Sequence, residues 1–222
     1  MKTLEIACFN LESAIIAQIG GADRVELCDN IQEGGTTPDF ETTKLARVAL
    51  SIDLFVIIRP RGGDFVYSEE EFQQMKEQII QFKEIGVNGF VFGILKEDGS
   101  VNKEQNAALV ALAEPLPCTF HRAFDVAKNV FESLEDVIDC GFMTILTSGQ
   151  EKNVVEGIDV LTELVKKANN RITIMPGGGL RSSNIGLIKE KTNAVFYHSS
   201  AIVDGSETAD NDEVNTLKAN LK

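Results

Sequence analysis

Short apolar runs alternate along the chain with longer stretches in which apolar residues recur every three or four positions. That spacing places apolar side chains on one face of a helix, as at Phe72, Met75, Ile79 and Phe82. The short runs between these stretches are typical of strands. They predict eight strands, at Leu4–Cys8, Arg24–Leu27, Leu54–Arg59, Gly89–Phe92, Cys118–His121, Thr144–Thr147, Arg171–Met175 and Ala194–His198.

The ends of the predicted helices carry their own signals. Ser68 with Glu71, and Asn129 with Glu132, have the spacing of a helix cap, in which side chains satisfy the free amides of the first turn. A glycine can take the left-handed conformation that ends a helix. Glycines precede three of the predicted strands, at Gly21, Gly86 and Gly141.

Strict alternation of strands and helices predicts parallel strands, because parallel neighbours need a crossover between them. Eight such units without a linker favour one domain over residues 1–222, an α/β fold closed into a compact parallel (β/α)8 TIM-like barrel. The alternative is an open doubly wound sheet. That fold is marked by a G-x-G-x-x-G turn after the first strand, and here the turn reads CFNLE. A short helical tail is predicted from Asn211 to Leu221.

Composition narrows the class of protein. At 222 residues, with 43% apolar and 25% charged residues, the chain suits a globular domain. A net charge of −13 opposes binding to nucleic acid or anionic lipid, and no apolar run reaches the about 18 residues of a membrane span. The N-terminal residues do not resemble a signal peptide, so we expect a cytoplasmic protein. The cysteines lack CxxC spacing and are expected to be reduced thiols: Cys8, Cys28, Cys118 and Cys140.

Polar residues collect at the predicted carboxyl ends of the strands, which form the functional mouth of a (β/α)8 barrel. The chain has 2 histidines, His121 and His198, and each closes a predicted strand. Histidines at equivalent places beside carboxylates and arginines favour a functional site, with a structural ion-pair network as the alternative. The candidate catalytic residues are Glu5, Glu26, Arg59, His121, Asp125 and His198.

Loops after the strands supply candidate binding groups. The proline and glycines of the segment from Ile58 to Phe65 would hold Arg61 and Asp64 over the mouth. Three glycines follow the seventh strand, where barrels often bind phosphate through backbone amides, and a plain tight turn is the alternative. The candidate binding residues are Arg61, Asp64, Arg122, Thr147, Ser148, Gly177, Gly178, Gly179 and Ser199.

Alternation along the strands assigns faces, since side chains two residues apart share one. If Glu26 faces the barrel interior, Arg24 and Cys28 do too. If Glu5 faces inward, Ala7 joins it and Cys8 points outward to the helices. Buried carboxylates need partners, and the sequence suggests arginines of the third-strand loop for that role: Arg59 and Arg61.

Several long motifs together resemble the copper homeostasis protein CutC family, from about Leu4 to Ala201. The resemblance implies a TIM-like barrel, a cytoplasmic location, a homodimer or higher homo-oligomer, and a role in handling copper. The motifs are GGADRVELC at 20–28, EGGTTP at 33–38, IRPRGGDF at 58–65, TFHRAFD at 119–125, LTSG at 146–149 and HSSA at 198–201.

Copper(I) favours thiolate ligands, so the resemblance makes Cys28 the candidate metal ligand. Family members often carry a cysteine where this chain has Ala7, whose side chain would share the inward face with Cys28. The adjacent Cys8 is expected to point away. A copper(I) site made from two thiolates of one chain is therefore not expected.

Two functions of different classes follow. The first is copper binding or handling, as the resemblance implies. The second is an enzyme acting on a small anionic or phosphorylated substrate, with Glu26 or Asp125 as base, His121 as acid or electrophile, and Arg59 and Arg61 as anion clamps. A barrel that binds such a ligand without turnover is a variant of the second. The expected partner is thus a small molecule or a metal ion.

Overall fold

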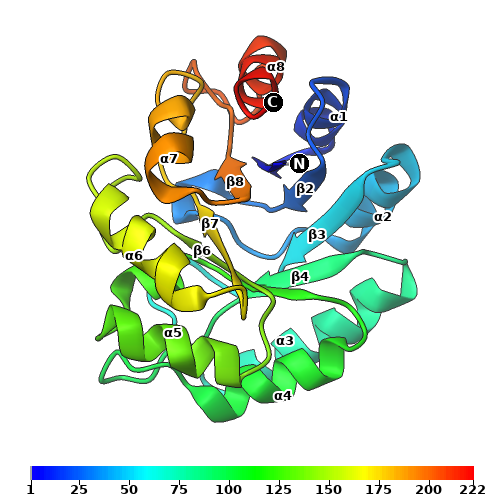
Figure 1. Ribbon diagram of the computed structural model, residues 1–222. Coiled ribbons are helices and arrows are strands. Elements are labelled where there is room, and N and C mark those ends of the chain that lie inside the picture. Colours follow the sequence, from blue (N-terminus) through cyan, green and yellow to red (C-terminus); the bar gives the residue numbers. More distant parts are fainter. Residues whose placement is uncertain (1) are drawn as a thin grey trace.

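The computed structural model describes residues 2–222 and shows eight parallel strands surrounded by helices (Figure 1). The predicted (β/α)8 barrel is confirmed. The strands are β1 (Thr3–Cys8), β2 (Arg24–Leu27), β3 (Asp53–Ile57), β4 (Gly89–Phe92), β5 (Cys118–Phe120), β6 (Thr144–Thr147), β7 (Thr173–Pro176) and β8 (Phe196–Ser199).

Helices connect successive strands and cover the outside of the sheet. Two short 3-10 turns, η1 (Ile31–Glu33) and η2 (Arg122–Val126), follow β2 and β5. The α-helices are α1 (Leu11–Ile19), α2 (Phe40–Ala49), α3 (Glu69–Glu84), α4 (Lys103–Ala113), α5 (Val130–Asp139), α6 (Ile158–Ala168), α7 (Ile185–Thr192) and α8 (Asn211–Asn220).

Five strands differ from the bounds that the sequence predicts, and β1 differs only in beginning one residue earlier, at Thr3. β3 ends at Ile57 because the amide of Arg59 donates to the Thr37 side chain instead of to a strand. β7 begins at Thr173 because the amide of Arg171 still closes a turn with Ala168. β8 runs from Phe196 to Ser199 instead of starting at Ala194, and β5 ends one residue before His121.

The barrel is nearly closed. Seven neighbouring strand pairs have a parallel register, in the order β7-β6-β5-β4-β3-β2-β1-β8. Between β7 and β8 no register is formed in the part of the chain that the structure describes. The two edge strands, β7 and β8, still lie side by side. A Cβ built on Gly177 would lie only 3.0 Å from the His198 Cβ, and the Ser199 hydroxyl donates to the Leu180 carbonyl.

Side chains of the strands form two separate cores. The larger one lies between the strands and the helices and contains Cys8, whereas a smaller cluster inside the barrel contains Cys28, Phe55 and Val91. Alternation along β1 and β2 produces this division, and the predicted faces of the two cysteines are confirmed. Polar residues share the interior with the small cluster, and they define the site.

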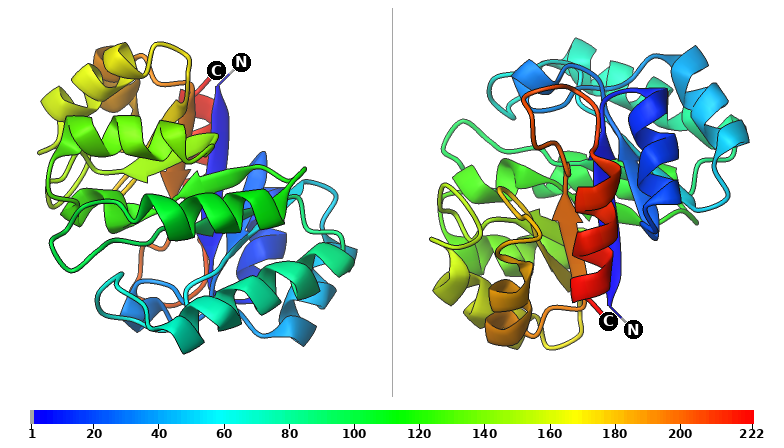
Figure 2. Two further views of the ribbon diagram at one scale, coloured as in Figure 1. Left: turned by 90° about the horizontal axis from the view of Figure 1, so that it is seen from below. Right: turned by 90° about the horizontal axis from the view of Figure 1, so that it is seen from above.

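The helix signals are also confirmed. Ser68 and Glu71 form a capping box at the start of α3, and the Asn129 side chain accepts from the Glu132 amide at the start of α5. The helical tail is α8, which packs beside α1 and the first strand (Figure 2). An ion pair between Lys218 and Asp23 fixes it there.

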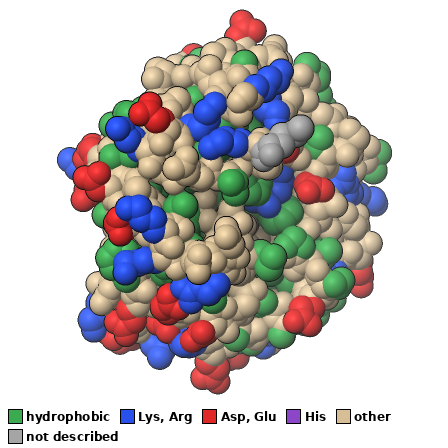
Figure 3. All heavy atoms as spheres, in the orientation of Figure 1, with side chains coloured by type: hydrophobic (Ala, Val, Ile, Leu, Met, Phe, Trp, Pro, Cys, Tyr) green, Lys and Arg blue, Asp and Glu red, His purple; other side chains and the backbone are tan. Residues whose placement is uncertain are grey.

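Charged side chains of both signs spread over the outer ring of helices, as the view of one barrel end shows (Figure 3). None of the helices formed by residues 2–222 combines the length and the apolarity that crossing a membrane requires.

Candidate functional site

A cavity of about 200 Å³ lies at the carboxyl ends of the strands. It is bordered by these predicted site residues: Glu26, Cys28, Arg59, His121, Arg122, Gly178, Gly179, His198 and Ser199. The remaining predicted residues lie behind the cavity wall or beyond its rim: Glu5, Arg61, Asp64, Asp125, Thr147, Ser148 and Gly177.

A buried ion-pair network forms the floor of the cavity. Glu5 is fully buried, and its two carboxylate oxygens bind different partners. One accepts from Arg24 Nε, and the other lies 2.7 Å from His198 Nδ1. The register explains the contacts, because Arg24 on β2 and His198 on β8 are the two Cα neighbours of Glu5 on β1.

Burial alone would raise the pKa of Glu5, but Arg24 and the His198 hydrogen bond outweigh it and lower that pKa. For His198 burial has the opposite effect, and the two carboxylates nevertheless raise its pKa above the ordinary value of 6.5. Glu5 is therefore ionised at neutral pH, and the pair favours a protonated His198. Arg24 is further fixed between two aromatic rings, with its guanidinium carbon 3.8 Å from the Phe55 centroid and 4.2 Å from that of Phe196.

Glu26 is the acid of this network that borders the cavity. Its carboxylate lies 3.8 Å from His198 Nε2, too far for a hydrogen bond. Burial, together with the charge of Glu5, raises the pKa of Glu26 to about 7 against the opposing effects of His198 and Arg24. A carboxyl group with this pKa exchanges its proton readily near neutral pH, which is what a general acid or base requires.

His121 lies in a different environment. Burial and the nearby Arg59 cation lower its pKa to about 3, so the ring is neutral at pH 7. The Ala123 amide donates to His121 Nδ1 at 3.3 Å, which leaves the ring proton on Nε2. Nε2 is buried and has no hydrogen-bond partner within residues 2–222. The neutral ring is thus a donor without an acceptor at the border of the cavity.

Within residues 2–222, Arg59 binds backbone carbonyls and no carboxylate. Its terminal nitrogens donate to Glu33, Gly35 and Gly63, at 2.6, 2.7 and 3.0 Å. The expectation that Arg59 neutralises a buried carboxylate is therefore wrong. The partner of Glu5 is Arg24, which the alternation already placed on the inner face.

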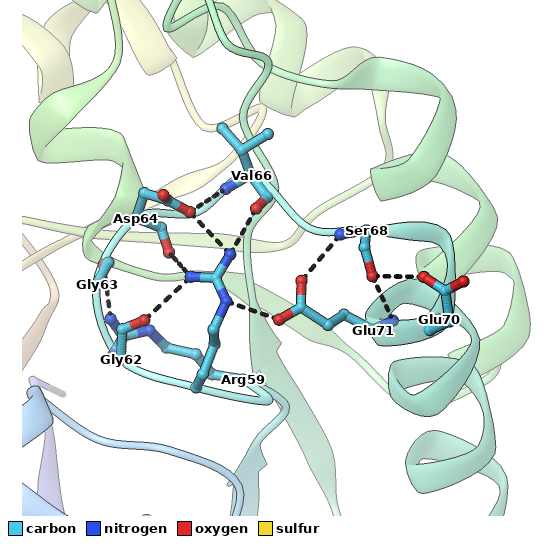
Figure 4. Close-up of polar contacts among 9 residues, drawn as sticks. Arg59, Gly62, Gly63, Asp64, Val66, Ser68, Glu70 and Glu71 are labelled. Atoms are coloured by element: carbon cyan, nitrogen blue, oxygen red, sulfur yellow. Dashed lines mark hydrogen bonds and ion pairs between the residues drawn. The ribbon is translucent and has the colours of Figure 1, made fainter.

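Arg61 and Asp64 do not lie over the cavity, which corrects the second expectation for this loop. Arg61 Nε donates to Glu71 at 2.6 Å, and Arg61 also pairs with Asp64 and with the Val66 carbonyl. Figure 4 shows this loop beside the start of α3, where the Glu71 carboxylate also reaches the Ser68 amide. The two residues attach the loop to the helix.

Asp125 holds the β6 loop in place. It accepts from the Thr147 hydroxyl, from the Ser148 amide and hydroxyl, and from the Gln150 amide. It also pairs with Arg122 at 2.7 Å. With its oxygens engaged and outside the cavity wall, Asp125 does not fit the role of base, and Thr147 and Ser148 do not border the cavity. They position Arg122, whose guanidinium lies against Gly178.

The β7 and β8 loops form the opposite rim. Gly178 and Gly179 have φ values of 102° and 71°, which side chains rarely adopt, so glycine is needed at both positions. Arg181 donates to the hydroxyls of Ser199 and Ser200, at 3.2 and 3.4 Å, and borders the cavity. Arg181 is not predicted as a site residue from the sequence; its position directly after the glycines and Leu180 was the available signal.

The residues that could hold a metal ion are Glu5, Glu26 and His198, whose candidate donor atoms all lie within 4.8 Å of one another. Cys28 borders the same cavity, but burial raises the pKa of its thiol well above 9.0. The nitrogen and carboxylate donors suit a divalent ion, whereas a copper(I) site of thiolates does not fit this cavity.

The fold and this ionisable cavity define the class: a (β/α)8 barrel whose strand ends enclose a buried Glu–Arg–His network. Residues 2–203 match the model of the CutC family. The chain belongs to the CutC family.

Relatives extend over most of the chain. A CutC family protein of Parabacteroides distasonis is 48% identical over 90% of this chain and 83% of its own length. The human copper homeostasis protein cutC homolog is 43% identical, over 89% of this chain and 72% of its own length. A CutC crystal structure from Streptococcus agalactiae is 35% identical with a TM-score of 0.86, and covers 90% of this chain and 99% of that one.

The barrel itself is more widely shared. Phosphoribosylanthranilate isomerase from Thermotoga maritima superposes with a TM-score of 0.67 at 16% identity, covering 100% of this chain and 98% of the isomerase. A likeness at this identity reflects the fold alone.

Proposed function

We propose that this protein acts in copper homeostasis and that the cavity at the strand ends is the site through which it acts. The observation that carries the proposal is the family membership, since human and mouse relatives at 43% and 44% identity are named copper homeostasis proteins. The site supports it with a group of three ionisable side chains able to hold a metal ion.

The ligand atoms at the site determine which oxidation state of copper we propose. Glu26 and His198 offer a carboxylate oxygen and an imidazole nitrogen at the cavity, a set that suits copper(II) better than copper(I). Cys28 is the one thiol in the interior cluster, and Cys8 lies in the other core. A bound ion would replace protons on Glu26 and His198, so its affinity would fall at acidic pH.

Metal titration tests the site. Metal-free protein is titrated with copper(II), and separately with copper(I) under reducing conditions, against a competing chelator. We expect one copper(II) per chain, lost in His198→Ala and weakened in Glu26→Gln, because these variants remove donors. Cys28→Ala should bind copper(II) with the same affinity as the control Cys140→Ala, which removes a buried thiol outside the cavity. Tight copper(I) binding that needs both Cys8 and Cys28 would contradict the proposed donors.

A cellular experiment tests the role. In a host without its own CutC protein, the wild-type chain should restore growth in excess copper, and His198→Ala should not. If wild type and His198→Ala restored growth equally at equal protein levels, the role in copper homeostasis would not depend on this cavity.

A further inference from the structure

Two arginines at the cavity have no carboxylate partner. Arg59 donates to three carbonyls, and Arg181 donates to two hydroxyls and to the Leu180 and Ile202 carbonyls. Within residues 2–222 neither guanidinium forms an ion pair with an acid, although the chain as a whole has a net charge of −13. Arg59 is also 95% buried, at 5% exposure, and its Nε has no acceptor there. The two guanidinium groups give this cavity positive charge that no paired carboxylate neutralises, which favours an anionic ligand.

The rim beside Arg181 offers further donors. Gly178 and Gly179 border the cavity, and their amides donate to no acceptor in the described part of the chain, whereas the neighbouring Gly177 amide donates to the Thr147 carbonyl. Ser200 adds a hydroxyl at the same rim. Several donors from two loops suit a tetrahedral oxyanion with three terminal oxygens.

His121 supplies a donor at another part of the wall. Its Nε2 carries the ring proton and lacks an acceptor, so it suits a neutral oxygen of a ligand. Known ligand pockets commonly have volumes of about 300–1,000 Å³. A cavity of about 200 Å³ therefore admits only a small molecule.

We infer that the cavity binds a small organic phosphate monoester. Its phosphate group lies at the β7–β8 rim against Arg181 and the amides of Gly178 and Gly179. A hydroxyl or carbonyl oxygen of its organic part accepts from His121 Nε2. This binding goes beyond the proposed copper function and requires no metal ion.

NMR titration of metal-free protein in the presence of a chelator tests the inference. The probes are glycerol 3-phosphate, inorganic phosphate, glycerol and lactate. Glycerol 3-phosphate and phosphate should shift the amide signals of Gly178 and Gly179, and glycerol and lactate should not. Arg181→Gln should weaken the binding of both glycerol 3-phosphate and inorganic phosphate, on the order of 10- to 100-fold, because it removes a charge-assisted contact. Arg171→Gln, which removes the same charge from a surface pair with Glu135, should have no effect.

His121→Phe separates the two halves of the ligand site. This variant should weaken the binding of glycerol 3-phosphate and leave the binding of inorganic phosphate unchanged. Unmoved signals of Gly178 and Gly179 in the wild type would overturn the inference, as would equal affinities in Arg181→Gln and Arg171→Gln. An equal response to lactate would overturn the choice of phosphate. Because the chelator removes copper, none of these outcomes depends on the proposed copper function.

Discussion

His121 and His198 stand at the same kind of position, at the end of a strand on the border of one cavity, yet their surroundings differ. His198 lies between two carboxylates, 2.7 Å from Glu5 and 3.8 Å from Glu26. His121 packs against the Phe65 ring, with centroids 4.9 Å apart, and the nearby charge that affects it is the Arg59 cation.

This difference gives the two rings opposite protonation. The carboxylates raise the pKa of His198 in spite of its burial, whereas burial and Arg59 lower the pKa of His121 to about 3. One wall of the cavity therefore holds a charged network that exchanges protons, and another holds a neutral hydrogen-bond donor. Residue type and strand position do not determine such a role; the neighbouring charges do.

Replacing Glu5 should have the largest effect on stability, because it removes the central carboxylate of the charged network around His198. Glu5→Ala leaves Arg24 buried between two aromatic rings without a counter-ion. Breaking a buried pair in this way costs about 3–5 kcal/mol of unfolding free energy, which urea denaturation measures.

The matched control is Glu135→Ala, which breaks a surface pair with Arg171 and should cost about 0–1 kcal/mol. Equal losses in the two variants would show that the Glu5 network contributes no more than an exposed ion pair.

The pH dependence of stability should be smaller and should arise from Glu26 and His198, against an opposite contribution of His121, whose lowered folded pKa makes stability rise with pH up to 6.5. Between its ordinary pKa of 4.5 and its folded pKa of about 7, Glu26 keeps a proton in the folded state that it loses on unfolding. Its contribution therefore declines as pH rises through that window, by at most about 3 kcal/mol. The raised pKa of His198 acts in the same direction above pH 6.5, whereas the lowered pKa of Glu5 matters only below 4.5.

Urea denaturation of wild type and Glu26→Gln at a series of pH values from 5 to 8 measures this decline as the difference between their unfolding free energies, because the opposite contribution of His121 is common to both. The difference should fall as pH rises, whereas the difference between wild type and Glu135→Gln should stay constant. A difference between wild type and Glu26→Gln that does not change with pH would show that Glu26 is ionised throughout.

The fold was predictable because its signals are local. Apolar periodicity predicts the eight strands, and alternation predicts that Cys8 and Cys28 lie on opposite faces, as they do. The strand ends were less certain, because single hydrogen bonds decide them. The bond from the Arg59 amide to Thr37, residues far apart in sequence, ends β3 early.

The site was only partly predictable, because ion pairing depends on register and on loop paths. Alternation put Arg24 inside the barrel, but its contact with Glu5 follows from the pairing of β1 with β2. Arg61 instead turns toward Glu71 on α3, a choice that the composition of the loop does not reveal. Residue types thus identified the cavity, and the structure assigned the partners.

The smallest expected effect concerns His121, whose protonation should not change between pH 5 and 8. With its pKa at about 3, the ring should keep constant carbon-bound proton shifts in NMR spectra between pH 5 and 8. His198 should titrate above 6.5 in the same spectra, and Glu5→Gln should lower its pKa by removing the carboxylate at Nδ1. The comparison between the two rings fails if His121 titrates in that range. Such a result would mean that water reaches Nε2, and that the ring is a cation near pH 6 instead of the fixed neutral donor that its contact with Ala123 indicates.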